Sequence, residues 1–407
     1  MPDTTRTYSG NPMRLQSAAF VLILLIGITG ILLSVRANAE TNSNEIQIPA
    51  AIYPGLDHLL ALADPAKNIA FDPQLVAGVL DFIETPKRND AIYFANTVSG
   101  LTSAYYDFEI SKSLETIVAY SFDPDIPVIA TMPSSARLFQ WADARGNRQA
   151  TPRLMQYLDD LESPVVLHGK VYLQITPDLT SGAYYGYNSF QVYLLFKHRQ
   201  RKVLVTVARQ VDVSSAGKKG YILGDDNDWD YYYSGKTGLT LPALGWVRSY
   251  MYDSSGINIY HEIDPNGSRV RCAMFKWLRA GWSKINMVQK KHIYRGLKRF
   301  AVPFKEIMEH PRLPSAATMA EDFSRITGLP DAVLVSRMDI YARLLEKRYN
   351  TGSRRSKKWS ADIFENKDHW RQLSREEMES ALVIEYVKYA LGKSRPEEVG
   401  ELLDLSR

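Results

Sequence analysis

Strand-forming residues are concentrated in one continuous part of the sequence, residues 165–283, and this constrains the fold more than any other feature. Within it, the apolar runs Phe190–Phe196 and Lys202–Val207 are joined through His198–Arg201, which predicts a β-hairpin. Alternate residues of the two strands should share one face of the sheet: Val192, Leu194, Phe196, Val203, Val205 and Val207. Short turns pair strands antiparallel, so we expect a mostly antiparallel sheet of five to seven strands.

Two further turns are predicted near the end of this region. Asp264–Gly267 contains an Asn-Gly pair, which favours a tight hairpin turn before a strand at Arg269–Leu278. Asp253–Gly256 has the composition of a hairpin turn between a strand ending at Tyr252 and one starting at Ile257. The region 165–283 should therefore consist of strands and turns throughout.

Helical patterns dominate on both sides of the strand region. Asp72 followed by Pro73 predicts a helix start, and Ser374 with Glu377 forms a capping box. We also expect a helix between Asn89 and Gly100, a short one at Arg137–Ala142, and a kink or restart at Pro303 in the helix after Trp282. Val128–Thr131 is predicted as a strand.

The order of helices, then strands, then helices predicts an α+β fold rather than alternating βαβ units. We expect a helix-rich N-terminal part at residues 40–164, a central antiparallel sheet region at 165–283 and a helical C-terminal region at 284–407. Residues 165–407 should form one packed unit.

The N-terminus has the pattern of an export signal. Residues 18–33 are apolar or glycine apart from Thr29, with Arg14 before them and Ala37-Asn38-Ala39 after them. A basic start, an apolar segment and small residues at a cleavage site are typical of a secretory signal peptide, so 1–39 should be a signal peptide or an N-terminal membrane anchor. The sequence predicts a protein exported across the cytoplasmic membrane, either periplasmic or anchored facing the periplasm.

Overall composition excludes several classes of function. The net charge of +4 among 407 residues is too small to indicate nucleic-acid binding, which export also disfavours. The single cysteine, Cys272, excludes an internal disulfide framework and a cysteine-based zinc site. Ser234–Thr237 resembles the end of a phosphate-binding loop, but the required glycine is replaced by Asp230, so no nucleotide site is expected.

An acidic run supplies the candidate metal ligands Asp225, Asp226, Asp228 and Asp230. Several oxygen ligands from one tight loop are what Ca²⁺ prefers. An EF-hand is excluded because Tyr231 takes the place of the required glycine. A solvated acidic loop, an irregular Ca²⁺ site and no cofactor at all remain open.

A basic block follows the acidic run. Residues 268–300 contain ten basic and no acidic side chains, whereas 220–264 contain seven acidic and two basic ones. The two blocks can pair within the fold, or the basic block can face an anionic partner such as a membrane surface, an envelope protein or an envelope polymer. The candidate binding residues are Trp282, Lys290, Lys291, Arg295, Lys298 and Arg299.

His261 and Glu262 are the candidate catalytic residues, and they lie next to each other in a predicted strand. No metalloprotease or nucleophile-elbow motif occurs in the sequence. We therefore expect a non-catalytic binding or scaffold protein of the cell envelope that uses the 268–300 block. The alternative is an exported hydrolase that acts on an envelope polymer with the loop Asp225–Asp230 and His261.

Overall fold

The computed structural model describes residues 44–88, 91–96, 100–142, 152–159, 161–241, 245–351 and 367–404. The chain divides into two units, Met1–Glu45 and Ile46–Arg407, and the fold below is that of the second. The predicted export segment at 1–39 lies outside the described residues. Within the described ranges, no helix combines the length and the apolar composition that crossing a membrane requires.

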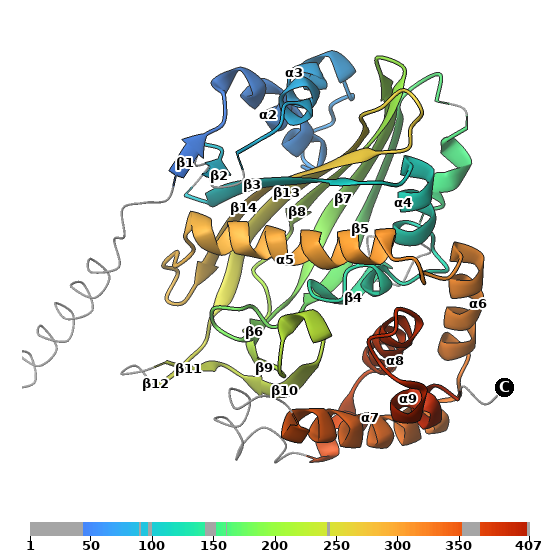
Figure 1. The fold of residues 1–407 in the computed structure, drawn as a ribbon. Coiled ribbons are helices and arrows are strands. Elements are labelled where there is room, and N and C mark those ends of the chain that lie inside the picture. Colours follow the sequence, from blue (N-terminus) through green and yellow to red (C-terminus); the bar gives the residue numbers. More distant parts are fainter. Residues whose placement is uncertain are drawn as a thin grey trace, which may run out of the picture. The chain divides into compact units, whose positions relative to one another are not determined.

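A nine-stranded sheet forms the centre of the second unit (Figure 1), in the order β1-β2-β3-β14-β13-β8-β7-β5-β4. Neighbouring strands from β2 to β4 all pair antiparallel. The strands are β1 Asn44–Gln47, β2 Ala91–Phe94, β3 Thr102–Ile110, β4 Ala136–Ala142, β5 Val165–Ile175, β7 Gly186–His198, β8 Arg201–Gln210, β13 Tyr250–Glu262 and β14 Val270–Gly281.

Two smaller sheets accompany the large one. The first has the order β10-β9-β6, and the second pairs β11 with β12. Their strands are β6 Ala183–Tyr184, β9 Lys218–Ile222, β10 Tyr231–Thr237, β11 Leu239–Leu241 and β12 Gly245–Val247. The acidic run is therefore the loop between β9 and β10.

Helices cover both faces of the large sheet. They are α2 Tyr53–Leu62, α3 Pro73–Glu84, α4 Leu114–Ser121, α5 Lys290–Glu309, α6 Ala316–Thr327, α7 Asp331–Thr351, α8 Arg375–Ala390 and α9 Pro396–Leu403. Together with the sheet they confirm the predicted α+β class, with helices at both ends of the chain.

The first face packs against α2 and α3. Their buried side chains, such as Leu59 and Leu80, join the predicted alternate residues of β7 and β8 in one apolar cluster. The prediction that Val192, Leu194 and Phe196 share a face with their partners on β8 is thus confirmed. Burying such side chains drives the pairing, because each contributes about 1.5–3 kcal/mol relative to exposure.

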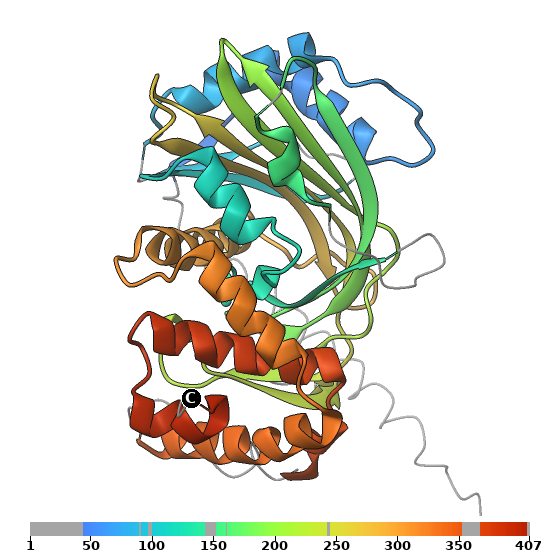
Figure 2. The ribbon, with the colours of Figure 1, turned by 90° about the vertical axis from the view of Figure 1, so that its right-hand side faces the viewer.

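The opposite face carries α4, α5 and the C-terminal helices in a second and larger cluster. In Figure 2, α6 to α9 gather beside the small β6–β9–β10 sheet. Tyr232 of β10 contacts Trp370 edge-to-face at 5.3 Å between ring centroids. This packing holds the β9–β10 loop between α5 on one side and α7 and α8 on the other, as the ion pairs described below make clear.

Several predicted elements differ in the structure. The helices expected between Asn89 and Gly100 and at Arg137–Ala142 are the strands β2 and β4, because each pairs along an edge of the sheet. The strand expected at Val128–Thr131 is a 3₁₀ turn, Val128–Ala130. Asp253–Gly256 is not a turn but lies within the long strand β13, where Asp253 pairs with Arg279 of β14.

Helix α5 continues through Pro303, where a kink or restart was predicted. Proline cannot donate a backbone hydrogen bond to the carbonyl four residues earlier. That carbonyl belongs to Arg299, and the Ser134 hydroxyl donates to it at 2.7 Å instead. A side chain from another element therefore replaces the missing donor, which lets the helix extend unbroken.

Candidate functional site

The four aspartates of the β9–β10 loop have separate partners. Asp225 caps a short 3₁₀ turn by accepting from the Asn227 N–H at 2.9 Å. Asp226 accepts from Arg299 Nε at 2.5 Å and Nη2 at 2.7 Å, and Tyr231 Oη donates to it at 2.9 Å. Asp228 is exposed. Each of these contacts is local to one carboxylate, so the run does not act as a single acidic cluster.

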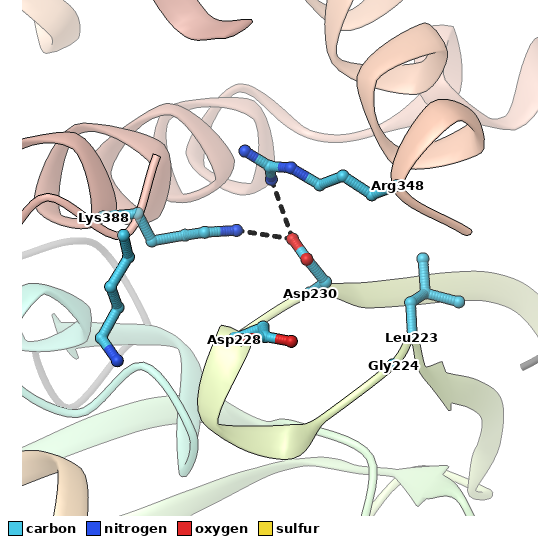
Figure 3. Close-up of a pocket in the computed structure, with 7 residues that line it drawn as sticks. Leu223, Gly224, Asp228, Asp230, Arg348 and Lys388 are labelled. Carbon is cyan, nitrogen blue, oxygen red and sulfur yellow. Dashed lines mark hydrogen bonds and ion pairs between the residues drawn. The ribbon is translucent and has the colours of Figure 1, made fainter. Parts of the chain in front are cut away.

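Asp230, the fourth aspartate, lies in a buried ion cluster (Figure 3). Its Oδ1 accepts from Lys388 Nζ at 2.5 Å and from Arg348 Nη1 at 2.8 Å. Glu385 of α8 accepts from both nitrogens of the Arg348 guanidinium at 2.8 and 2.9 Å and is 3.2 Å from Lys388 Nζ. Two carboxylates and two cations thus balance in the interior, and they connect β10 with α7 and α8.

Burial and charge act in opposite directions on these carboxyl groups. Burial raises the pKa of Asp230, and Lys388 and Arg348 only partly offset it. For Glu385 burial is again the largest effect, but Lys388 and Arg348 together outweigh it and lower the pKa. Glu385 is 1% exposed, so its charge depends on both cations.

A cavity of about 210 Å³ adjoins the cluster, lined by Leu223, Gly224, Asp228, Asp230, Arg348, Lys388 and Lys393. Lys393 Nζ is 2.9 Å from Glu306 and lies 4.7 Å from the centre of the Trp229 ring. Among the described residues, no group of three or more His, Cys, Asp or Glu side chains is placed to hold a metal ion. Asp226 is instead neutralised by Arg299 of the basic block, and Asp230 by Arg348 of α7 and Lys388 of α8. Of these two aspartates, Asp226 is the one that pairs the acidic block with the basic block.

His261 and Glu262 are buried and do not line this cavity. His261 is on the sheet face that carries Ile257 and Ile259 and packs toward α2 and α3, with Nδ1 3.5 Å from Glu84 Oε1. Glu262 accepts from the Lys202 N–H at 2.7 Å. The structure does not bring His261 together with the acidic loop, so the arrangement required for the hydrolase alternative is not formed.

The basic block also separates into two groups. Arg299 is 10% exposed at its side chain and is fully engaged by Asp226, the Thr176 hydroxyl and the Pro177 carbonyl. Asp226 raises the pKa of Arg299 despite an opposing effect of burial. Arg299 is therefore an internal ion-pair partner rather than a surface-binding residue.

The other basic residues of α5 lie at its surface. Lys291, Arg295 and Lys298 are exposed and follow one another at helical spacing, which places them on one face of α5. Within the described part of the chain, no carboxylate lies within ion-pair distance of these three. Lys290, at the start of the helix, packs over the Phe94 ring at 3.4 Å. The exposed cations are thus available to a partner outside the molecule.

An exposed apolar loop precedes α5, between Trp282 and Gln289. Ile285 is 57% exposed and Met287 is 44% exposed, whereas Trp282 is partly buried. Ser283 and Lys284 both have positive φ angles, 50° and 63°, and the Ile285 N–H donates to the Trp282 carbonyl at 2.9 Å. This tight turn holds the Ile285 side chain outward.

We call Lys284, Ile285, Met287, Lys291 and Arg295 together the α5 patch. Sequence reasoning found its charges but missed its apolar tip, because an isoleucine or methionine next to a helix start is usually buried. The signal in the sequence was the group of three apolar residues Ile285, Met287 and Val288 between Lys284 and the first lysine of the helix.

Comparison of the chain with models of known protein families gave no match, and comparison with curated proteins gave no match at a significant level.

Proposed function

We propose that the protein is an exported, non-catalytic binding or scaffold protein of the cell envelope, which contacts an anionic membrane surface through the α5 patch. The observation that carries this proposal is the combination of two exposed apolar side chains, Ile285 and Met287, with nearby cations that have no carboxylate partner among the described residues. The basic, apolar-rich N-terminal segment supports export or anchoring.

The energetics suit reversible contact. Each basic side chain near an anionic bilayer contributes about 1 kcal/mol. Ile285 and Met287 would each add up to about 1.5–3 kcal/mol if their insertion were complete. The patch alone therefore supports weak binding that depends on ionic strength, and an N-terminal anchor would add to it without depending on lipid charge.

The test is co-sedimentation of the full chain with vesicles of phosphatidylcholine alone and with added phosphatidylglycerol. In the variant Lys284→Glu/Lys291→Glu/Arg295→Glu, we expect the affinity gained from phosphatidylglycerol to fall on the order of 100-fold. This follows because each of the three lost cations contributes about 1 kcal/mol. The control is Lys67→Glu/Lys197→Glu/Arg343→Glu, which changes the net charge equally at exposed positions elsewhere. Equal losses in the two variants, or none in the first, would contradict the proposal.

A second variant distinguishes insertion of the apolar side chains into the bilayer from electrostatic attraction of the cations to the lipid headgroups. Ile285→Ser/Met287→Ser should weaken binding to phosphatidylglycerol vesicles while leaving its salt dependence unchanged, because the cations remain. If this double variant bound as tightly as the wild type, the apolar tip would have no part in the contact.

A further inference from the structure

A second cavity, of about 370 Å³, lies between the segment that connects α3 to β2, strand β3 and helix α5. Lys87 and Arg88 line it from the connecting segment, and Tyr294 and Lys298 line it from α5. Its volume falls within the range of about 300–1,000 Å³ that is typical of small-molecule sites. Three elements distant in sequence thus enclose a space large enough for a ligand.

The charges that line this cavity are mainly positive. Lys87, Arg88 and Lys298 are cationic, and Asp107 is the one carboxylate among the lining residues. Asp107 is already paired, since Arg271 Nη1 is 3.2 Å from its Oδ2. The lining residues therefore carry a net charge of about +2, which matches the charge of about −1.5 to −2 on a phosphate monoester at neutral pH.

Lys87 is the cation best placed to contact a bound anion. It donates to the carbonyls of Phe82 and Thr85 at the end of α3 and lies 3.9 Å from the centre of the Phe82 ring. An ammonium group has three N–H donors, so one remains without an acceptor among the described residues. Burial lowers the pKa of Lys87 to about 8, with Asp107 opposing and Arg271 reinforcing that effect. A bound anion would offset this loss of hydration.

Tyrosine side chains form much of the remaining wall. Tyr105 is 1% exposed, and its hydroxyl has no hydrogen bond of normal geometry to any described residue, although Asp107 is close enough to raise its pKa further after burial. An unsatisfied buried hydroxyl is unfavourable unless a ligand or water completes it. Tyr106 and Tyr294 pack edge-to-face at 5.4 Å and offer two more hydroxyl groups.

We infer that this cavity binds a small phosphate monoester with a hydroxyl-bearing body, in which Lys87 and Lys298 contact the phosphate and the Tyr105 hydroxyl forms a hydrogen bond with the ligand. Soluble polyol and sugar phosphates carry a phosphate monoester beside hydroxyl groups. The phosphoglycerol headgroups of anionic lipids carry a phosphate diester in the same setting. The site is independent of the α5 patch, because none of the five patch residues lines it.

The test is isothermal titration calorimetry of the full chain with glycerol 3-phosphate, glycerol and inorganic phosphate. We expect glycerol 3-phosphate to bind more tightly than inorganic phosphate and glycerol not to bind. Lys87→Met should weaken binding at least about tenfold, through loss of a charge-assisted contact. The control Lys197→Met, at an exposed position of β7 outside both proposed sites, should leave the affinity unchanged.

Tyr105→Phe separates a ligand contact from a structural role. It removes a hydroxyl that makes no hydrogen bond of normal geometry to a described residue, although Asp107 is close, so the unliganded variant should be nearly as stable as the wild type while binding glycerol 3-phosphate several-fold more weakly. A destabilised variant with unchanged affinity would overturn the assignment of Tyr105. Absence of binding to the wild type at 10 mM would overturn the assignment of a soluble ligand.

Vesicles containing phosphatidylglycerol distinguish the two sources of the phosphate group. Binding to vesicles that falls in Lys87→Met assigns the site to a lipid headgroup, whereas vesicle binding unaffected by Lys87→Met assigns it to the soluble ester. If Lys87→Met changed neither vesicle binding nor glycerol 3-phosphate binding, the cavity would not be a phosphate site. The α5 patch is tested by the vesicle binding of the α5 patch variant, and the cavity is tested by the effect of Lys87→Met on glycerol 3-phosphate binding. Either proposal can therefore be contradicted without the other.

Discussion

The His261 imidazole is buried on the α2–α3 side of the sheet. Its protonation should therefore affect the stability of the fold, and the imidazole is not placed to act as a catalytic base. It is 0% exposed, and neither ring nitrogen has a hydrogen-bond partner among the described residues. Burial, with smaller contributions from Arg201 and His198, lowers its pKa to about 3. A base that is neutral from pH 3 upward and has no access to solvent contributes little to acid–base chemistry at neutral pH.

The pKa of His261 predicts a specific dependence of stability on pH. In the unfolded chain the imidazole titrates near 6.5, so between about pH 3 and 6.5 the unfolded state binds the extra proton and the native state does not. The contribution of neutral His261 to the free energy of unfolding is therefore fully present above pH 6.5. It is lost progressively as the pH decreases toward 3. The shift corresponds to roughly 3–5 kcal/mol in total.

The measurement is urea unfolding of the wild type and His261→Gln between pH 4 and pH 8. The free energy of unfolding of the variant should fall less steeply on acidification than that of the wild type, because the titrating group is gone. His168→Gln, at an exposed position of β5, is the matched control and should retain the wild-type slope. Parallel slopes in all three proteins would contradict the prediction.

At the level of elements, the ion cluster of Asp230, Arg348, Glu385 and Lys388 joins the small sheet to α7 and α8. Removing one partner of a buried ion pair leaves an uncompensated charge, which costs about 3–5 kcal/mol. We therefore expect Lys388→Met to destabilise the protein by this amount, measured by chemical unfolding. Lys393→Met, on the same cavity but with a partly exposed ion pair to Glu306, should cost about 0–1 kcal/mol.

A compensating variant makes the same prediction sharper. Lys388→Met/Asp230→Asn removes one cation together with one carboxylate and leaves Arg348 paired with Glu385. It should be more stable than Lys388→Met alone, since no net charge stays buried. If the double variant lost the sum of the two single effects, the four residues would not be acting as one charge-balanced cluster.

The local rules of helix capping predicted the helices well. Asp72 accepts from the Gln74 N–H at the start of α3, and Ser374 and Glu377 form both bonds of the capping box that opens α8. These two signals depend on residues within one turn, so they can be recognised without knowledge of distant partners. The same holds for the hairpin between β7 and β8, whose alternation is set by near neighbours.

The elements that sequence reasoning missed are those decided by distant partners. Ala136–Ala142 pairs with β5, where Trp141 packs directly over Gly169, a position with no room for a Cβ atom. Nothing near Trp141 in the sequence indicates that glycine. The candidate sites follow the same rule: Asp230 contacts Lys388 across 158 residues, and Lys87 and Lys298 line one cavity because α5 packs against β3.

At the scale of the whole molecule, one large sheet separates the two larger apolar clusters, and a third, smaller cluster forms around Tyr185, Leu239 and Met251. The cluster under α2 and α3 begins with Ile48 and Ile52, close to the boundary between the units at Glu45 and Ile46. Ile48 is 2% exposed, and its N–H donates to the Phe94 carbonyl of β2 at 2.9 Å. This short segment is therefore part of the folded unit, even though it lies next to the unit boundary.

The position of this boundary predicts the effect of shortening the chain. A chain that starts at Asn44 keeps β1 and both isoleucines, so its free energy of unfolding should equal that of the full chain. A chain that starts at Tyr53 loses two buried isoleucines and the Ile48–Phe94 hydrogen bond, which together contribute about 3.5–7.5 kcal/mol. Urea unfolding followed by circular dichroism and by tryptophan fluorescence measures both. Equal stability of the two shortened chains would mean that residues 44–52 lie outside the cooperative unit, and the first apolar cluster would then have to begin at α2.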